Sequence, residues 1–171
     1  MKKEEKKQLK KLYVSIFIIV FFIILIDQIS KILVIHYGEI TLISNTLILK
    51  ATDFNNGVYN ETSRAVTILT NLVILFIIFG IIKSNNQFIT KNTKILLSFA
   101  LAGGISNMID RICRGNVVEF INFSNLPALN IADICIAIGW ISFVAIFACF
   151  STKELSKKKT EEIDEQKAEK K

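Results

Sequence analysis

The sequence has very few of the residues on which disulfide-bonded domains, metal sites and histidine-based enzymes depend. Among its 171 residues there are one proline, one histidine and three cysteines. Cys113, Cys135 and Cys149 are too few and too scattered for a disulfide framework, and no two of them have the compact spacing of a structural zinc motif. Apolar thiols within helices are the simpler interpretation, and a metal site that includes His36 is the alternative. We therefore predict a protein with no metal and no cofactor.

The single histidine also makes a nucleophilic enzyme the weaker choice. A serine or cysteine nucleophile needs a base beside it, and none of them has His36 as an obvious base partner. Any hydrolytic chemistry in this chain is therefore expected to rest on carboxylates.

Charged residues are missing from long parts of the chain, and 51% of the residues are hydrophobic. A transmembrane helix needs about 20 predominantly apolar residues. Four stretches meet or approach that length: residues 12–35, 65–82, 95–112 and 131–150. The first run is longer than a signal-peptide core and ends without an A-x-A-like cleavage site, so we interpret it as a retained span. The predicted fold class is a membrane all-α protein of four transmembrane helices with a small extracytoplasmic β element.

The lysines that produce the net charge of +6 gather before the first span, between the second and third spans, and after the fourth. With four spans these regions share one side of the membrane, and the positive-inside rule makes that side cytoplasmic. The basic charge therefore reflects topology, and we expect no nucleic-acid partner. We predict one membrane domain over residues 12–150, a solvated charged tail over 1–11 and a disordered cytoplasmic tail over 151–171.

The segments outside the membrane carry strand signals. Residues 39–43 and 46–50 flank Ser44-Asn45 and predict a small β-hairpin within the outer segment 36–64. Residues 117–121 predict a further short strand. A hairpin of this size is marginal alone, so we expect it to rest on the membrane surface or on the outer helix ends.

Acidic residues at the ends of the apolar segments are the candidate site. Asp110 ends the third, outward-running span and Asp133 begins the fourth, inward-running span, so both are predicted at the same face and depth. Two carboxylates in close, partly dry contact share one proton, and such a pair can activate water and polarise a peptide carbonyl. The alternative for Asp133, or for Asn130 before it, is a helix cap.

Other polar residues at membrane depth are expected to support these two acids. Asn107 and Arg111 share a helical face with Asp110, and Asp27 and Lys31 share a face of the first span. A mutually neutralising Asp27–Lys31 pair is the simpler alternative. Gly103-Gly104 either lets two helices approach closely or faces substrate.

Five motifs resemble the bacterial lipoprotein signal peptidase (signal peptidase II) family. They are, in order, Asp27-Gln28-x-Ser30-Lys31, Asn55-x-Gly57, Gly103-Gly104-x-x-Asn107-x-x-Asp110-Arg111, Gly115-x-Val117-Val118-x-Phe120-Ile121 and Asn130-x-Ala132-Asp133. The resemblance covers the four-span body and leaves only the tails outside. It implies an intramembrane aspartyl endopeptidase that removes signal peptides from lipid-modified prolipoproteins, cutting before the diacylglyceryl-modified cysteine. It also implies a periplasm-facing β-cradle.

The resemblance further implies that Asp110 and Asp133 are the catalytic pair. Supporting or binding roles are implied for Asp27, Lys31, Asn55, Gly57, Asn107, Arg111 and Asn130. We expect a monomer in the bacterial cytoplasmic membrane, in contact with membrane lipid, with both termini cytoplasmic and the active site near the outer face. Two departures concern the site: Glu119 stands where the family usually has Asp, and the segment after Gly57 differs from the family pattern. The alternative functions are a catalytically silent lipoprotein-binding relative and a small proton-coupled transporter subunit.

Overall fold

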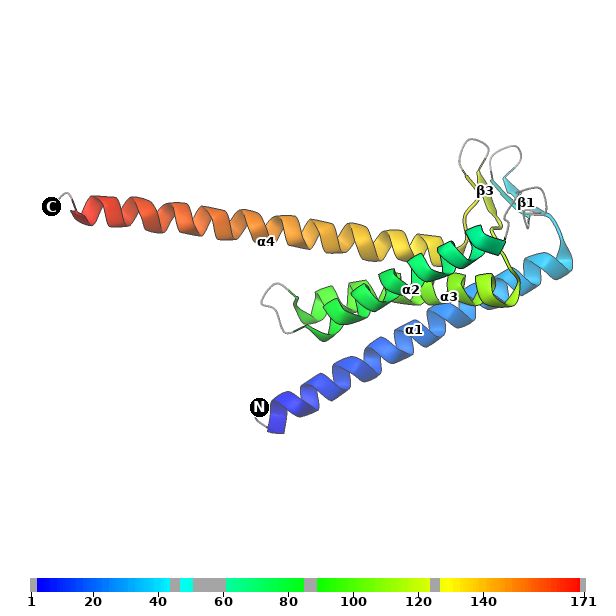
Figure 1. Cartoon of the computed structure of the whole chain (residues 1–171), viewed down its shortest axis with the longest axis horizontal. Coiled ribbons are helices and arrows are strands. Elements are labelled where there is room, and N and C mark those ends of the chain that lie inside the picture. The colour runs from blue at the N-terminus through cyan, green and yellow to red at the C-terminus, as the bar shows by residue number, and fades with distance from the viewer. Residues whose placement is uncertain (1–2, 44–46, 51–60, 85–88, 124–126, 170–171) are drawn as a thin grey trace.

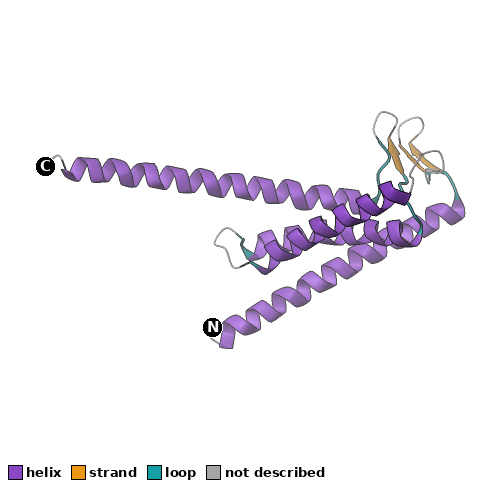
Figure 2. Ribbon diagram, viewed as in Figure 1, coloured by secondary structure: helices purple, strands orange, loops and turns teal. Residues whose placement is uncertain are grey.

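The computed structural model describes residues 3–43, 47–50, 61–84, 89–123 and 127–169. It consists of long helices with a small sheet at one end of the bundle (Figures 1 and 2). The helices are α1 (Lys3–Tyr37), α2 (Glu61–Lys83), α3 (Lys91–Cys113) and α4 (Ile131–Glu169), and the strands are β1 (Ile40–Ile43), β2 (Leu47–Leu49) and β3 (Ile121–Phe123). Within these described residues, four helices are long and apolar enough to cross a membrane. The predicted fold class is confirmed.

Helix α3 lies at the centre and packs against each of the other three helices. In the most apolar 18-residue stretch of α3, 56% of the residues are buried, against 11–17% in the corresponding stretches of α1, α2 and α4. The other helices expose large side chains such as Phe17, Phe76 and Ile141. A surface of this composition is suited to lipid, which is as apolar as the side chains themselves. Polar residues of α3 such as Ser106, Asn107 and Asp110 are consequently enclosed by protein.

Glycines bring the neighbouring helices close to α3. A Cβ atom added to Gly139 of α4 would lie 2.6 Å from the Ala100 Cβ, and one added to Gly104 would lie 2.7 Å from the Leu75 Cδ2 of α2. Such distances are shorter than van der Waals contact, so the helix backbones approach as closely as they do because these side chains are absent. The close-packing interpretation of Gly104 is therefore supported.

The strands form one antiparallel sheet in the order β1-β2-β3. The predicted hairpin is confirmed as β1 and β2, whereas its predicted turn, Ser44-Asn45, lies outside the described residues. The prediction of a strand over 117–121 is wrong in its bounds, because the third strand begins at Ile121. The Val118 N–H donates to the Asp110 carboxylate instead of to a neighbouring strand. The sheet extends the bundle at the end where α1 and α3 finish (Figure 1).

Both charged tails are helical where the structure describes them, which differs from the disorder expected over residues 151–171. Helix α1 begins at Lys3 and α4 continues to Glu169. Lysine, glutamate and glutamine have high helix propensity, and a helix already formed by the apolar segment extends into them without a new nucleation step. The start of α1 at Lys3 and the end of α4 at Glu169 both lie away from the sheet (Figure 1), so the two termini share one end of the bundle.

Candidate active site

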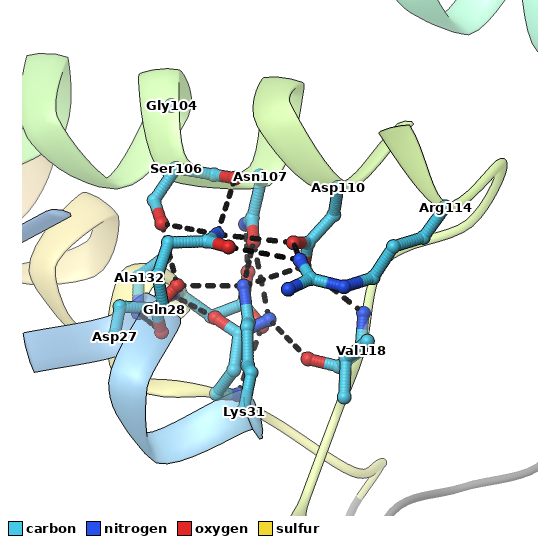
Figure 3. Close-up of polar contacts among 12 residues, drawn as sticks. Asp27, Gln28, Lys31, Gly104, Ser106, Asn107, Asp110, Arg114, Val118 and Ala132 are labelled. Carbon is cyan, nitrogen blue, oxygen red and sulfur yellow. Dashed lines mark hydrogen bonds and ion pairs between the residues drawn. The ribbon is translucent and has the colours of Figure 1, made fainter. Parts of the chain in front are cut away.

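A chain of buried charges joins α1 to α3 near the sheet end of the bundle (Figure 3). The Lys31 Nζ atom lies 2.6 Å from the Asp27 Oδ2 and 2.7 Å from the Asp110 Oδ2, and all three side chains are fully buried. The Lys31 Nζ also donates to the Asn107 Oδ1 at 3.0 Å. Removing one member of a buried ion pair costs about 3–5 kcal/mol, since the other charge remains without a partner. The simple Asp27–Lys31 pair considered from the sequence is therefore part of a larger network.

Asp27 connects α1 to both other helices of the site. Its Oδ2 accepts a hydrogen bond from the Ser106 Oγ at 2.7 Å, and its Oδ1 accepts one from the Ala132 N–H at 2.9 Å. Ala132 is in the first turn of α4, where backbone N–H groups have no acceptor within the helix. A carboxylate at this position also favours the positive end of the helix dipole. Asp27 thus fixes where α4 begins relative to α1 and α3.

Asp110 is enclosed by donors. Its Oδ2 accepts from Lys31 and, at 3.1 Å, from the Val118 N–H; its Oδ1 accepts from the Gln28 Nε2 at 3.0 Å and from the Arg114 Nη1. An ionised carboxylate offers about four lone-pair sites. These four protein donors account for all of them, and the side chain has no exposed surface. The geometry therefore favours a structural anion at Asp110 over a group that takes a proton from water.

Asp133 has a different environment because it is only half-buried. Its Oδ1 accepts from the Asn107 Nδ2 at 2.8 Å and its Oδ2 accepts from the Asn130 N–H at 3.1 Å. The Asp133 N–H donates in turn to the Asn130 Oδ1 at 2.8 Å, so the two residues form a reciprocal cap on α4. Asn130 also donates to the Asn107 Oδ1 at 3.1 Å. The capping alternative is confirmed, and the cap leaves part of the Asp133 carboxylate accessible.

Asp133 borders two hollows in the surface. One has a volume of about 340 Å³ and lies between α2, α3 and α4, where Thr67, Asn71 and Arg111 line it with Asp133. The other, of about 390 Å³, is an apolar groove along α4 lined by Ile134, Ile138 and Ile141 among others. Volumes of this size suit part of a peptide or a lipid chain. The Asp133 carboxylate is therefore reached both from a hollow of mixed polar and apolar lining and from an apolar groove.

Glu119 is the second carboxyl group in electrostatic range of Asp133. Burial raises the pKa of Glu119, the negative charge of Asp133 raises it further, and Lys31 and Arg111 oppose both effects. Its neighbours in the chain are fixed, since Val118 donates to Asp110 and the Phe120 N–H donates to the Leu129 carbonyl at 2.9 Å. Glu119 is thus held between two anchored residues and shares its surroundings with Asp133.

The structure brings most of the predicted site residues together. Asp27, Lys31, Asn107, Asp110, Asn130 and Asp133 form one hydrogen-bonded network. Arg111 lines the hollow beside Asp133, whereas the guanidinium on Asp110 belongs to Arg114. Asn55 and Gly57 lie outside the described residues. Within the described residues, no group of three or more His, Cys, Asp or Glu side chains is arranged to hold a metal ion.

The sequence analysis gave no role to Gln28, which stands in the first motif, and did not single out Ser106 or Arg114. Arg114 follows Asp110 at the i+4 position, a spacing that signals helical ion pairs, but it lies just beyond the end of α3. Thr67 and Asn71 were also passed over, because isolated polar residues in an apolar span carry no signal of which face they occupy.

Comparison with known proteins gives consistent results. A sequence model of the signal peptidase (SPase) II family matches residues 19–150. The chain is 31% identical over 175 residues to the lipoprotein signal peptidase of Rickettsia canadensis, a match that covers 90% of this chain and 85% of that protein. It is 31% identical over 129 residues to that of Brevibacillus brevis, covering 68% and 83%. The match to that of Rickettsia typhi, 32% identical over 111 residues, spans only 53% of that protein.

Two solved structures described as bacterial membrane enzymes share the fold. Their TM-scores are 0.65 and 0.67, at 23% and 22% sequence identity, and they cover 84% and 78% of this chain and 91% and 92% of their own. The family match spans the four helices and the sheet, and membership implies a membrane protease that processes the signal peptides of lipoproteins. The predicted family is confirmed: this chain belongs to the signal peptidase II family.

Proposed function

We propose that this chain is an aspartyl-type endopeptidase that cuts prolipoproteins before their diacylglyceryl-modified cysteine. The observation that carries the proposal is the half-buried Asp133, which borders a hollow of about 340 Å³ and lies in electrostatic range of a second carboxyl group, Glu119. Two carboxyl groups, one to take a proton from water and one to donate to the carbonyl oxygen, are what acid–base hydrolysis of a peptide requires.

The proposal pairs Asp133 with Glu119 and gives Asp110 a supporting role, in place of the Asp110–Asp133 pair expected from the sequence. Asp110 is fully buried and accepts from four protein donors. Glu119 retains part of its exposure, and its pKa is raised, first by burial and then by Asp133. An acid with a raised pKa is available in its protonated form, which is the form that can donate to a substrate carbonyl.

In the proposed mechanism Asp133 acts as the base. Its carboxylate is oriented by Asn107 and by the Asn130 N–H, and it takes a proton from a water molecule as that water attacks the scissile carbonyl carbon. Protonated Glu119 donates a hydrogen bond to the carbonyl oxygen, stabilises the charge that develops there and retains its proton. The tetrahedral intermediate then collapses, the C–N bond breaks, and the proton on Asp133 passes to the departing amine. No covalent enzyme intermediate is formed.

The surroundings of Asp133 support a lipid-modified peptide as the substrate. Thr67 and Asn71 offer hydrogen-bonding groups to an extended peptide within the hollow between α2, α3 and α4. Ile134, Ile138 and Ile141 offer an apolar wall for the signal peptide or an acyl chain. We further propose a monomer in the bacterial cytoplasmic membrane with both termini in the cytoplasm and the site near the outer face, as the lysine distribution indicates.

Cleavage of a diacylglyceryl-modified prolipoprotein by the purified protein in detergent tests this function. We expect Asp133→Asn and Glu119→Gln each to abolish signal-peptide release while the protein still unfolds cooperatively on heating, and Glu119→Asp to keep measurable activity. Asp110→Asn is expected to lower the unfolding temperature, because it removes a buried charge from an ion-paired network.

The variants also separate the alternatives. If Glu119→Gln cleaves like the unmodified protein while Asp110→Asn is folded and inactive, the pair is Asp110 and Asp133. Binding of the prolipoprotein without release of the signal peptide by the unmodified protein would indicate the silent relative. Absence of binding, with proton uptake in vesicles, would indicate the transporter.

A further inference from the structure

Arg114 occupies a position that the proposed mechanism leaves without a role. It is the first residue after α3, and the next residue, Gly115, turns the chain with a φ of 88°. The Arg114 Nη1 donates to the Gln28 Oε1 at 2.8 Å and also to the Asp110 Oδ1 (Figure 3). The arginine therefore folds back over the end of its own helix and joins it to α1.

Gln28 completes this connection. Its Nε2 donates to the Asp110 Oδ1 at 3.0 Å and to the Ser106 Oγ at 3.0 Å, while its Oε1 accepts from Arg114. One amide group thus contacts two turns of α3 and the arginine beyond it. A planar guanidinium is suited to such shared acceptors, since its donors lie in a fixed geometry.

Arg114 also balances the charge of the buried chain. Asp27, Lys31 and Asp110 alone carry one excess negative charge, and Arg114 brings the sum to zero. The side chain of Arg114 is 26% exposed, so its charge costs less to desolvate than that of the fully buried Lys31. Without it, an uncompensated anion would lie next to the carboxyl groups of the site.

The same network reaches Glu119 through the backbone. Asp110 accepts from the Val118 N–H at 3.1 Å, and Val118 directly precedes Glu119. The Asp110 carbonyl also accepts from the N–H groups of Arg114 and Gly115, at 2.7 and 3.1 Å. The segment from Arg114 to Val118 is therefore attached to Asp110 at both of its ends.

We propose that Arg114, held by Gln28, is a positioning residue that keeps Asp110 in place and thereby sets the position and proton affinity of Glu119. This inference rests on the proposed function for its catalytic consequence. Arg114 touches neither substrate nor water in the reaction; it acts through Asp110 and Val118.

The test compares Arg114→Met with Arg114→Lys in the full-length protein in detergent. Arg114→Met is expected to lower kcat about 10–100-fold with KM changed less than about twofold, because misplacing a catalytic group affects the reaction step more than binding. The kcat–pH profile is expected to move to higher pH, since an excess negative charge favours protonated carboxyl groups nearby. Arg114→Lys restores the charge, so the pH profile should return to that of the unmodified protein with only part of the kcat.

Lys50→Met is the matched control. Lys50 also forms an outer-end ion pair, 3.1 Å from Glu39, but both side chains are exposed and neither contacts Asp110. The Lys50→Met substitution should leave kcat and the kcat–pH profile unchanged. An Arg114→Met enzyme with unaltered kcat and pH profile, or one altered only in KM, would overturn the proposal.

Amide hydrogen exchange provides a measurement that does not depend on cleavage. In Arg114→Met the Val118 amide should exchange about 10-fold faster or more, whereas in Lys50→Met it should not change. Unchanged exchange in Arg114→Met would overturn the inference even if the protein proved to be no protease. If the unmodified protein does not cleave the prolipoprotein, the proposed function is overturned but the inference about Arg114 and the Val118 amide is not.

Discussion

Asp110 and Glu119 illustrate how surroundings rather than residue type assign a carboxyl group its role. Asp110 accepts from Lys31, Gln28, Arg114 and the Val118 N–H. Glu119 instead lies where burial and the charge of Asp133 both disfavour its ionised form. In a medium of low polarity such differences separate an anion that organises structure from an acid that can exchange a proton.

The raised pKa of Glu119 predicts how stability depends on pH. Between its ordinary pKa and the raised one, the folded protein binds more protons than the unfolded chain, so Glu119 makes stability fall as pH rises through that window. Glu119→Gln removes the penalty. We expect the variant to have a higher Tm than the unmodified protein at neutral pH and no advantage below about pH 4, where the unfolded glutamate is also protonated.

Thermal unfolding in detergent at several pH values measures this difference. Glu39→Gln is the control, because Glu39 is exposed and paired with Lys50. A Tm advantage of Glu119→Gln that grows on acidification would contradict the assigned direction.

At the scale of elements, the site exists because α3 and α4 approach closely. Gly139 faces Ala100, where an added Cβ would lie 2.6 Å from the Ala100 Cβ and 2.7 Å from its backbone nitrogen. Backbone atoms cannot move aside as a flexible side chain can. The distance between these helices in turn determines how Asn107 of α3 meets Asp133 of α4.

Gly139→Ala is therefore expected to destabilise the protein by about 1–3 kcal/mol, since overpacking forces the two helices apart. Gly80→Ala is the matched control: Gly80 is also a helical glycine, but an added Cβ would meet nothing within 4 Å. It should be neutral or stabilising by up to about 1 kcal/mol. Denaturant unfolding in mixed micelles compares the two.

Equal effects of the two substitutions would show that helix propensity, and not the α3–α4 contact, controls stability. Activity provides a second comparison, because only Gly139→Ala should alter the Asn107–Asp133 contact.

At the scale of the whole molecule, the lysine distribution and the bundle lead to the same topology. The start of α1 and the end of α4 lie at the same end of the bundle, away from the sheet (Figure 1). Lysines gather at that end, in the first turns of α1 and the last turns of α4. By the positive-inside rule this end is expected to be cytoplasmic, which is the orientation proposed above.

Reporter fusions in a bacterial cell test this orientation. Green fluorescent protein fused after Lys171 should fluoresce, and alkaline phosphatase fused there should be inactive. Alkaline phosphatase fused after Lys50, behind the first span and the hairpin, should be active. The opposite pattern would place the site on the cytoplasmic face and contradict the proposed localisation.

The sequence alone was sufficient for the spans, the hairpin and the family, because each depends on local signals. Apolar runs of about 20 residues predict spans wherever they occur. Local signals led to wrong predictions where contacts with other parts of the chain decide the conformation of a segment. The charged tails are helical because each adjoins an apolar helical span, and residues 117–120 do not form a strand because Val118 donates to a side chain of α3.

The roles of the acids were decided by tertiary structure. The opposite directions of the third and fourth spans correctly predicted that Asp110 and Asp133 lie at the same end of the bundle. The directions of the spans do not indicate which of the two side chains is enclosed and which is accessible. That difference arises from contacts between residues far apart in the chain, such as Gln28 with Arg114 and Asp27 with Ala132. Long-range contacts of this kind determine the surroundings of a carboxyl group, and the surroundings determine its charge.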